Sequence, residues 1–140
     1  MFDSSWLELP SKENWEARKL WFESLGDSFV NEHASYGLSD QACALVGEVQ
    51  TAFCAGAWIT VLVMAIAVAE SHFGEFGYSD FTDNPTLHNL RKRRNSIVHF
   101  QAKHPGVGLD QQWLNRTQLE TEAKEAIRLM FEVFYSDVGT

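Results

Sequence analysis

Residues 49–69, VQTAFCAGAWITVLVMAIAVA, form a run of 21 uncharged residues between Glu48 and Glu70. An uncharged run of this length is a candidate membrane span. Its Ala, Gly, Thr and Gln residues dilute its hydrophobicity, and no Lys or Arg lies between Lys19 and Arg91 to set an orientation across a membrane. We therefore expect a buried helix at the centre of a bundle or a dimer, no membrane partner, and a protein that stays in solution without detergent.

Helical patterns continue on both sides of this run, and no stretch alternates with the period of a β-strand. Start and stop signals predict helices over about residues 11–33, 39–71, 84–103 and 117–135. The second of these helices is expected to be continuous and about 45 Å long, and residues 72–83 to form a loop. Ser11 is expected to be the N-cap of the first helix and Pro85 the first residue of the third, and a capping box of Thr117 and Glu120 is expected to start the last helix. The last helix is also predicted to bury one stripe of side chains, those of Leu119, Ala123, Ile127, Met130, Phe131 and Phe134. The sequence thus predicts one all-α domain over residues 1–140, an up-down bundle of four or five helices.

The charges of the chain are unevenly distributed. The 140 residues include 11 Lys and Arg against 19 Asp and Glu, a net charge of −8. An acidic protein of this kind is not a general nucleic-acid coat. However, residues 84–109 contain no acid and carry five cations, which are Arg91, Lys92, Arg93, Arg94 and Lys103. An acidic body with one basic segment indicates a local site for an anion.

Cysteine and histidine placement argues against disulfide and metal chemistry. Cys43 and Cys54, 11 residues apart on one predicted helix, would lie about 16 Å from each other, too far to bridge. We expect both to be small core residues in a reducing compartment. The first residues show no signal-peptide pattern, so a cytoplasmic location is expected. The 5 His residues form no ligand pattern, so neither a metal nor another cofactor is expected.

The predicted helix over residues 84–103 contains the segment LHNLRKRRNSIVHF, residues 87–100. Within it, Arg94, Asn95 and His99 form the pattern R-N-x-x-x-H. This pattern resembles the R-x(4–6)-H motif of the higher eukaryote and prokaryote nucleotide-binding (HEPN) superfamily. The context is also similar, because the motif lies in the penultimate helix of a small helical chain, after a long apolar helix and an irregular loop.

The resemblance implies a metal-independent endoribonuclease in a toxin, defence or stress system, with Arg94 and His99 as catalytic residues. A neutral His99 would take the proton of the 2′-hydroxyl, or a protonated His99 would give a proton to the leaving oxygen. Arg94 would stabilise charge on the scissile phosphate. Toxin-like members often carry a Tyr two residues after the His, where this chain has Gln101. The chain contains no nucleotidyltransferase sequence, so any antitoxin would be another protein.

Other residues are candidates for supporting roles at this site. Asn95 shares a helix face with His99 and could orient its imidazole, contact a phosphate, or be a surface residue. Glu70 ends the apolar run, where family members often carry a polar or acidic residue facing the site; its alternative is an ordinary helix-end charge. His88, six residues before Arg94, could line the same site, but we expect it to be an ordinary solvated residue. The candidates for binding phosphate or RNA are Arg91, Lys92, Arg93 and Lys103.

Two features predict a homodimer. Arg94 and His99, five residues apart, point about 140° from each other, and a composite site across a two-fold axis would bring both groups into one cleft. The uncharged run also exceeds what a lone four-helix bundle needs to bury. Two other interpretations remain open. One is a non-catalytic module of the same fold that binds nucleotide, RNA or a protein partner, and the other is an unrelated helical bundle with an accidental match.

Overall fold

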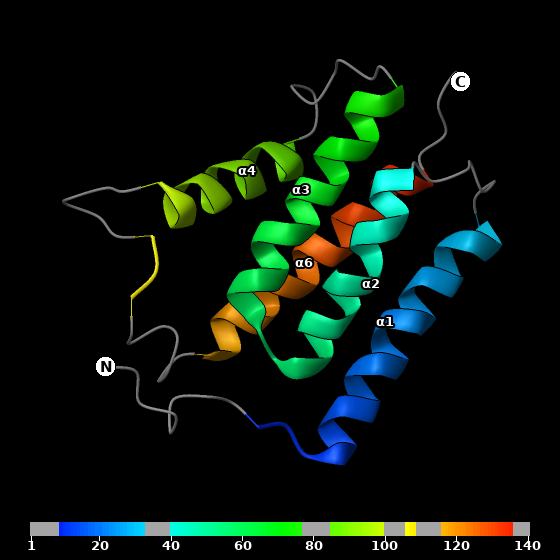
Figure 1. Ribbon diagram of the computed structural model, residues 1–140, viewed down its shortest axis with the longest axis vertical. Coiled ribbons are helices and arrows are strands. Elements are labelled where there is room, and N and C mark those ends of the chain that lie inside the picture. Colours follow the sequence, from blue (N-terminus) through cyan, green and yellow to red (C-terminus); the bar gives the residue numbers. More distant parts are fainter. Residues whose placement is uncertain (1–8, 33–39, 77–84, 100–105, 109–115, 136–140) are drawn as a thin grey trace.

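The computed structural model describes residues 9–32, 40–76, 85–99, 106–108 and 116–135 (Figure 1). These residues form five helices and no strand, which confirms the all-α prediction. The helices are α1 (Lys12–Glu32), α2 (Asp40–Ala55), α3 (Trp58–Phe76), α4 (Pro85–Val98) and α6 (Arg116–Phe134).

The predicted continuous helix over residues 39–71 is wrong, because the chain turns at Gly56 and forms the α2–α3 hairpin. Gly56 has a φ of 79°, a conformation that glycine adopts without the steric cost of a Cβ. Its N–H donates to the Phe53 carbonyl at 3.1 Å, and the Ala57 N–H donates to the Ala52 carbonyl at 2.9 Å. These two bonds make a Schellman motif, which satisfies the Ala52 and Phe53 carbonyls near the end of α2.

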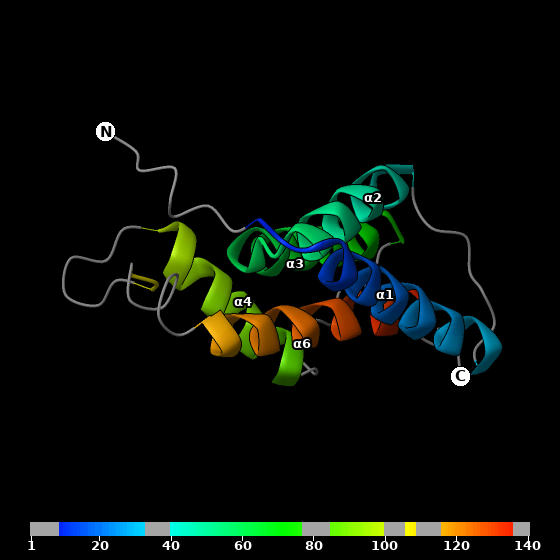
Figure 2. The same cartoon turned by 90° about the horizontal axis from the view of Figure 1, so that it is seen from below.

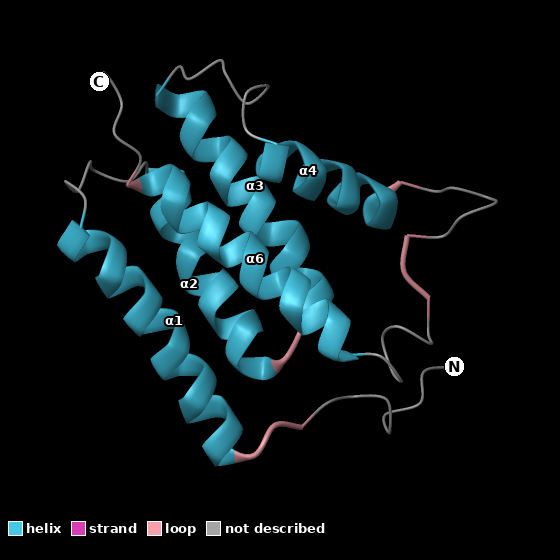
Figure 3. Ribbon diagram, turned by 180° about the vertical axis from the view of Figure 1, so that it is seen from behind, coloured by secondary structure: helices cyan, strands magenta, loops and turns pink. Residues whose placement is uncertain are grey.

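The other helices pack around this hairpin. α6 covers one face of it and is seen in front of α2 and α3 from behind (Figure 3). α1 lies along the flank of α2, and α4 lies on the flank of α3 (Figures 1 and 2). α4 crosses α3 rather than running beside it, so the predicted up-down arrangement does not extend to α4 (Figure 1).

The centre of the molecule is apolar and rich in aromatic rings. The Phe53 ring lies 5.0 Å from that of Trp21, 6.3 Å from that of Phe22 and 5.4 Å from that of Trp58, measured between centroids. The predicted buried stripe of α6 is confirmed for Leu119, Ala123, Ile127, Met130, Phe131 and Phe134. Six apolar side chains of α3, those of Val61, Leu62, Ala65, Ile66, Val68 and Ala69, are buried within the single chain, whereas those of Ile59, Val63, Met64 and Ala67 are half-buried.

Helix starts agree with the sequence better than helix ends do. The Ser11 hydroxyl accepts the Asn14 N–H at 3.1 Å, so Ser11 is the N-cap of α1 as predicted. Pro85 is the first residue of α4, also as predicted. In contrast, α6 already begins at Arg116, so Thr117 lies inside the helix and the predicted capping box is not its start.

Two predicted boundaries differ from the structure at helix ends. α3 continues to Phe76, so part of the predicted loop over residues 72–83 is helical. α4 ends at Val98 instead of near residue 103. None of the helices in the described ranges is both long and apolar enough to cross a membrane.

Candidate functional site: the Glu70–Arg94 cluster

One face of α4 packs on α3 and carries two arginines that lie beside Glu70. Leu87 and Leu90 are buried against the core. Arg91 and Arg94 follow Leu87 at the i+4 and i+7 positions, so helical periodicity places them on the same face as the leucines. The face that begins as an apolar contact therefore continues as two guanidinium groups beside the C-terminal half of α3.

Glu70 of α3 forms ion pairs with both of these arginines. Its Oε1 lies 2.7 Å from Arg94 Nη1 and 3.3 Å from Arg91 Nε. Asn95 Oδ1 accepts hydrogen bonds from the Nε of Arg94 at 3.2 Å and from its Nη2 at 3.0 Å. We call these four residues, Glu70, Arg91, Arg94 and Asn95, the Glu70 cluster. The structure thus brings together four of the residues that the sequence singled out.

The Arg94 guanidinium is fixed from two sides. Its side chain is only 16% exposed, against 31% for Glu70 and 45% for Arg91. Asn95 therefore positions the arginine, a role that the sequence did not anticipate for its side chain. A guanidinium has five N–H donors, and the bonds to Glu70 and Asn95 engage its three nitrogens while leaving further N–H groups on Nη1 and Nη2. A guanidinium held in this way is preorganised for a planar, two-point contact with a phosphate.

Arg93 points away from this cluster, since consecutive residues differ by about 100° around a helix. Its Nε donates to Glu122 Oε2 of α6 at 2.9 Å, and its Nη1 donates to the Gly106 carbonyl. A Cβ at Gly106 would overlap the Ser96 carbonyl, so only glycine fits this close approach. Arg93, one of the predicted phosphate-binding residues, joins α4 to α6 and to the 106–108 segment.

His99 lies at the open end of α4 and is exposed. Its N–H donates to the Asn95 carbonyl at 3.0 Å, so helical hydrogen bonding reaches His99 and keeps its side chain directed well away from Arg94. The structure does not bring His99 into the Glu70 cluster of the same chain. Lys92 and His88 are exposed on the same helix, and Lys103 lies outside the described residues.

His72 is a histidine whose position the sequence analysis missed, because it assigned residue 72 to a loop. It lies on α3 with 3% of its surface exposed, and its ring meets the Phe134 ring edge-on at 5.1 Å. Two residues apart on a helix, Glu70 and His72 point in nearly opposite directions, so His72 faces α6 and the core. Among the described residues, no three His, Cys, Asp or Glu side chains come together in a way that could hold a metal ion.

The Glu70 cluster can bind an anion such as phosphate through its two guanidinium groups. Two guanidinium groups share one carboxylate, so the three charged side chains keep a net positive charge at the surface of an acidic protein. A phosphate that binds there competes with Glu70 for Arg91 and Arg94. No protein-family model matches the sequence, and comparisons with curated proteins and with solved structures give no match either. The assignment of a function therefore depends on the motif and on the geometry of α4.

Proposed function

We propose that the protein is a metal-independent endoribonuclease of HEPN type, acting in a toxin, defence or stress system. One observation carries the proposal: the Arg94 guanidinium is held between Glu70 and Asn95 on the helix that ends at the exposed His99. Without a metal, histidine can transfer the proton and arginine can stabilise the charge that develops during RNA cleavage.

The reaction is a transfer within the RNA itself. The 2′-oxygen attacks the adjacent phosphorus, the bond to the 5′-oxygen breaks, and the products are a 2′,3′-cyclic phosphate and a 5′-hydroxyl. A neutral His99 takes the proton of the 2′-hydroxyl, or a protonated His99 gives one to the leaving 5′-oxygen. Arg94 stabilises the charge that develops on the phosphate oxygens.

A homodimer completes the proposed site. In one chain His99 points away from Arg94, so the histidine of one protomer would act beside the arginine of the other, across a two-fold axis. This geometry supports a dimer together with the uncharged run, in which Val63 and Met64 are only half-buried within one chain. Sedimentation at micromolar concentration should give twice the 15.9 kDa of the chain. A 15.9 kDa species alone would rule out the composite site.

A non-catalytic module that binds RNA or a partner, such as a separate antitoxin protein, is the second candidate. It is favoured by the same contact that fixes Arg94, since a carboxylate already occupies the guanidinium. In this case Glu70 and Arg94 would serve to hold α4 against α3. Wild-type protein that binds RNA without ever cutting it would support this second function.

The experiment measures cleavage of single-stranded RNA in excess EDTA. We expect wild-type protein to cleave, and Arg94→Ala to lose about a hundredfold or more in rate. Glu70→Gln should bind RNA more tightly, because a competing charge is gone, and cleave it more slowly, because Arg94 loses an anchor. Lys92→Ala is the control cation and should keep the rate. Loss of all activity in EDTA, or a wild-type rate for Arg94→Ala, would contradict the proposal.

A further inference from the structure

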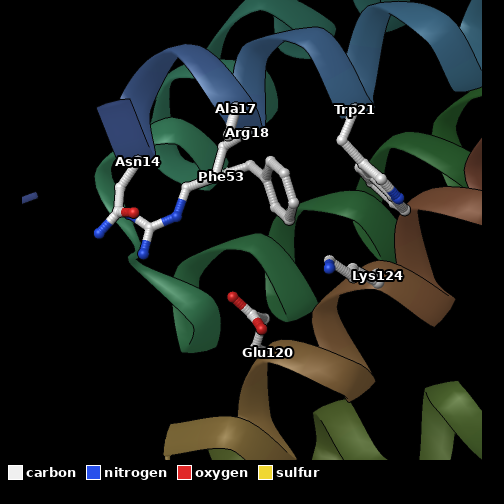
Figure 4. A pocket seen from close by; sticks show the side chains of 7 residues that line it. All are labelled: Asn14, Ala17, Arg18, Trp21, Phe53, Glu120 and Lys124. Atoms are coloured by element: carbon white, nitrogen blue, oxygen red, sulfur yellow. The ribbon is translucent and has the colours of Figure 1, made fainter. Parts of the chain in front are cut away.

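A second cationic region lies between α1 and α6, next to the turn of the α2–α3 hairpin. A hollow of about 430 Å³ opens there, lined on one side by Arg18 and Trp21 of α1 and on the other by Glu120 and Lys124 of α6 (Figure 4). A second hollow of about 240 Å³ shares Arg18 and Glu120 with it and adds Arg116. We call these two hollows the α1–α6 groove. The larger one is within the size range of small-ligand pockets.

The groove gathers cations in a part of the chain that is otherwise acidic. Outside residues 84–109 the sequence has 6 cations against 19 acids. Arg18, Arg116 and Lys124 line the groove, whereas Glu120 is the one carboxylate among its lining residues. A fourth cation, Arg128, lies 5.5 Å from the centre of the Trp21 ring. This concentration of positive charge favours an anionic ligand.

The two arginines of the groove are held in place by the end of α2. Arg18 Nη1 donates to the Cys54 carbonyl at 3.1 Å, and Arg116 Nη2 donates to the Gly56 carbonyl. Carbonyls at a helix C-terminus lack partners within the helix and attract cations. The Arg18 guanidinium also lies 4.8 Å over the Trp58 ring. A ligand therefore meets cations whose positions are already set, which reduces the entropy lost on binding.

The wall of the groove also includes a flat aromatic ring. Trp21 is half-buried, with its ring centre 5.0 Å from that of Phe53, which supports it from the core side. Lys124 Nζ lies 5.3 Å from the same ring. Lys124 and Arg128 both lie over this ring, so a phosphate that draws the cations toward itself uncovers the indole for a planar ring joined to that phosphate.

We propose that the α1–α6 groove binds a small molecule in which a phosphate is attached to a planar ring, such as a nucleoside monophosphate. Lys124 and Arg18 contact the phosphate, and Trp21 contacts the ring. The groove is distinct from the Glu70 cluster: Trp58 and Glu70 stand 12 positions apart on α3, about 18 Å along the helix axis. The site is independent of the proposed RNA cleavage and stands or falls separately.

The test titrates the protein with adenosine monophosphate, inorganic phosphate and adenosine by calorimetry. The monophosphate should bind at least about tenfold more tightly than either of its halves, because only it engages both Lys124 and Trp21. Lys124→Gln should weaken its binding by about tenfold, the loss of one charge-assisted contact. Lys92→Gln makes the same change of charge on α4 and should leave the affinity unchanged. Equal weakening by the two variants, or equal binding of adenosine and its monophosphate, would overturn the proposal.

A second readout does not depend on how well a variant folds. In wild-type protein, the monophosphate should shift the indole N–H signal of Trp21 in a nitrogen–proton correlation spectrum. The amide signals of Arg94 and Asn95 should stay unchanged. Shifts confined to α4 would overturn the proposal and place the ligand at the Glu70 cluster. The absence of any shift at millimolar ligand would overturn it as well.

Discussion

The α2–α3 hairpin and α4 are attached to the rest of the molecule by different forces. The hairpin places Val49, Phe53, Val61 and Ile66 in the core without exposed surface. α4 buries Leu87 and Leu90, and its other links to the core include ion pairs at the protein surface. Burial of a large apolar side chain contributes about 1.5–3 kcal/mol, whereas a solvent-accessible ion pair typically contributes about 0–1 kcal/mol.

This difference separates the residues that stabilise the fold from those that serve the proposed function. A substitution in the hairpin removes packing that nothing else replaces. A substitution on the charged face of α4 changes contacts that water can partly take over. We therefore expect changes in the hairpin to alter the free energy of unfolding, and changes in α4 to alter activity while the domain stays folded.

Phe53→Ala tests the hairpin most severely. Phe53 has no exposed surface, and its ring packs against the rings of Trp21, Phe22 and Trp58. The free energy of unfolding should fall by about 3–5 kcal/mol, measured by urea denaturation. Leu20→Ala is the control, because Leu20 is 66% exposed and its truncation should change stability by less than about 0.5 kcal/mol. A similar loss for both variants would show that Phe53 is not the centre of the core.

Gly47 inside α2 and Gly56, which directly follows α2, should respond to alanine with opposite signs. Gly56→Ala places a Cβ on a residue with a φ of 79° and should cost about 1–2 kcal/mol. Gly47 lies inside α2, where an added Cβ meets no atom within 4 Å, so Gly47→Ala should stabilise by about 0.5–1 kcal/mol. Thermal melting of both variants checks this pair. Stabilisation by Gly56→Ala would mean that α2 and α3 form one continuous helix after all.

Neighbouring cations of α4 should also differ. Arg93→Ala breaks the pair with Glu122 and should lower stability by about 1 kcal/mol, measured by melting. Lys92→Ala removes an exposed charge, so it should leave melting unchanged and reduce the salt dependence of RNA binding by about one charge. If Lys92→Ala destabilises the protein and Arg93→Ala does not, then Arg93 is not the residue that links α4 to α6, and the account of this face of α4 is wrong.

The two free cysteines report on the hairpin with little disturbance. Cys43 is exposed and Cys54 is buried, so the expectation that both lie in the core is wrong for Cys43. Burial raises the pKa of the Cys54 thiol, which lowers its thiolate fraction near pH 8. Alkylation followed by mass spectrometry should modify Cys43 first, and Phe53→Ala should speed modification of Cys54. Equal rates in wild-type protein would contradict the burial of the end of α2.

Local signals predicted much of the fold, and the features that were missed either lack a local signal or depend on contacts between distant residues. Ser11 and Pro85 mark helix starts through their own chemistry, and the stripe of α6 follows from periodicity. The turn at Gly56 was missed because the residues on both sides of it are apolar, so no polar residue interrupts the run. The partner of Arg93 was missed because Glu122 lies 29 residues away, beyond the reach of any helical spacing.

The candidate site was predicted in part, because some of its residues are close together in the sequence. Arg94, Asn95 and His99 stand in one short motif, so a sequence can show them together. The α1–α6 groove has no motif, because Arg18, Trp58 and Arg116 come from three helices and meet only in the folded chain.

The most direct test of α4 as the catalytic helix compares two exposed histidines on it. His99→Ala and His88→Ala remove the same side chain from opposite ends of α4. In EDTA, His99→Ala should cleave RNA about 10² to 10⁴ times more slowly than wild-type protein, because it lacks the proton-transfer group, and should melt at the wild-type temperature. His88→Ala should keep both properties. A wild-type cleavage rate for His99→Ala, or an equal loss in both variants, would contradict the account.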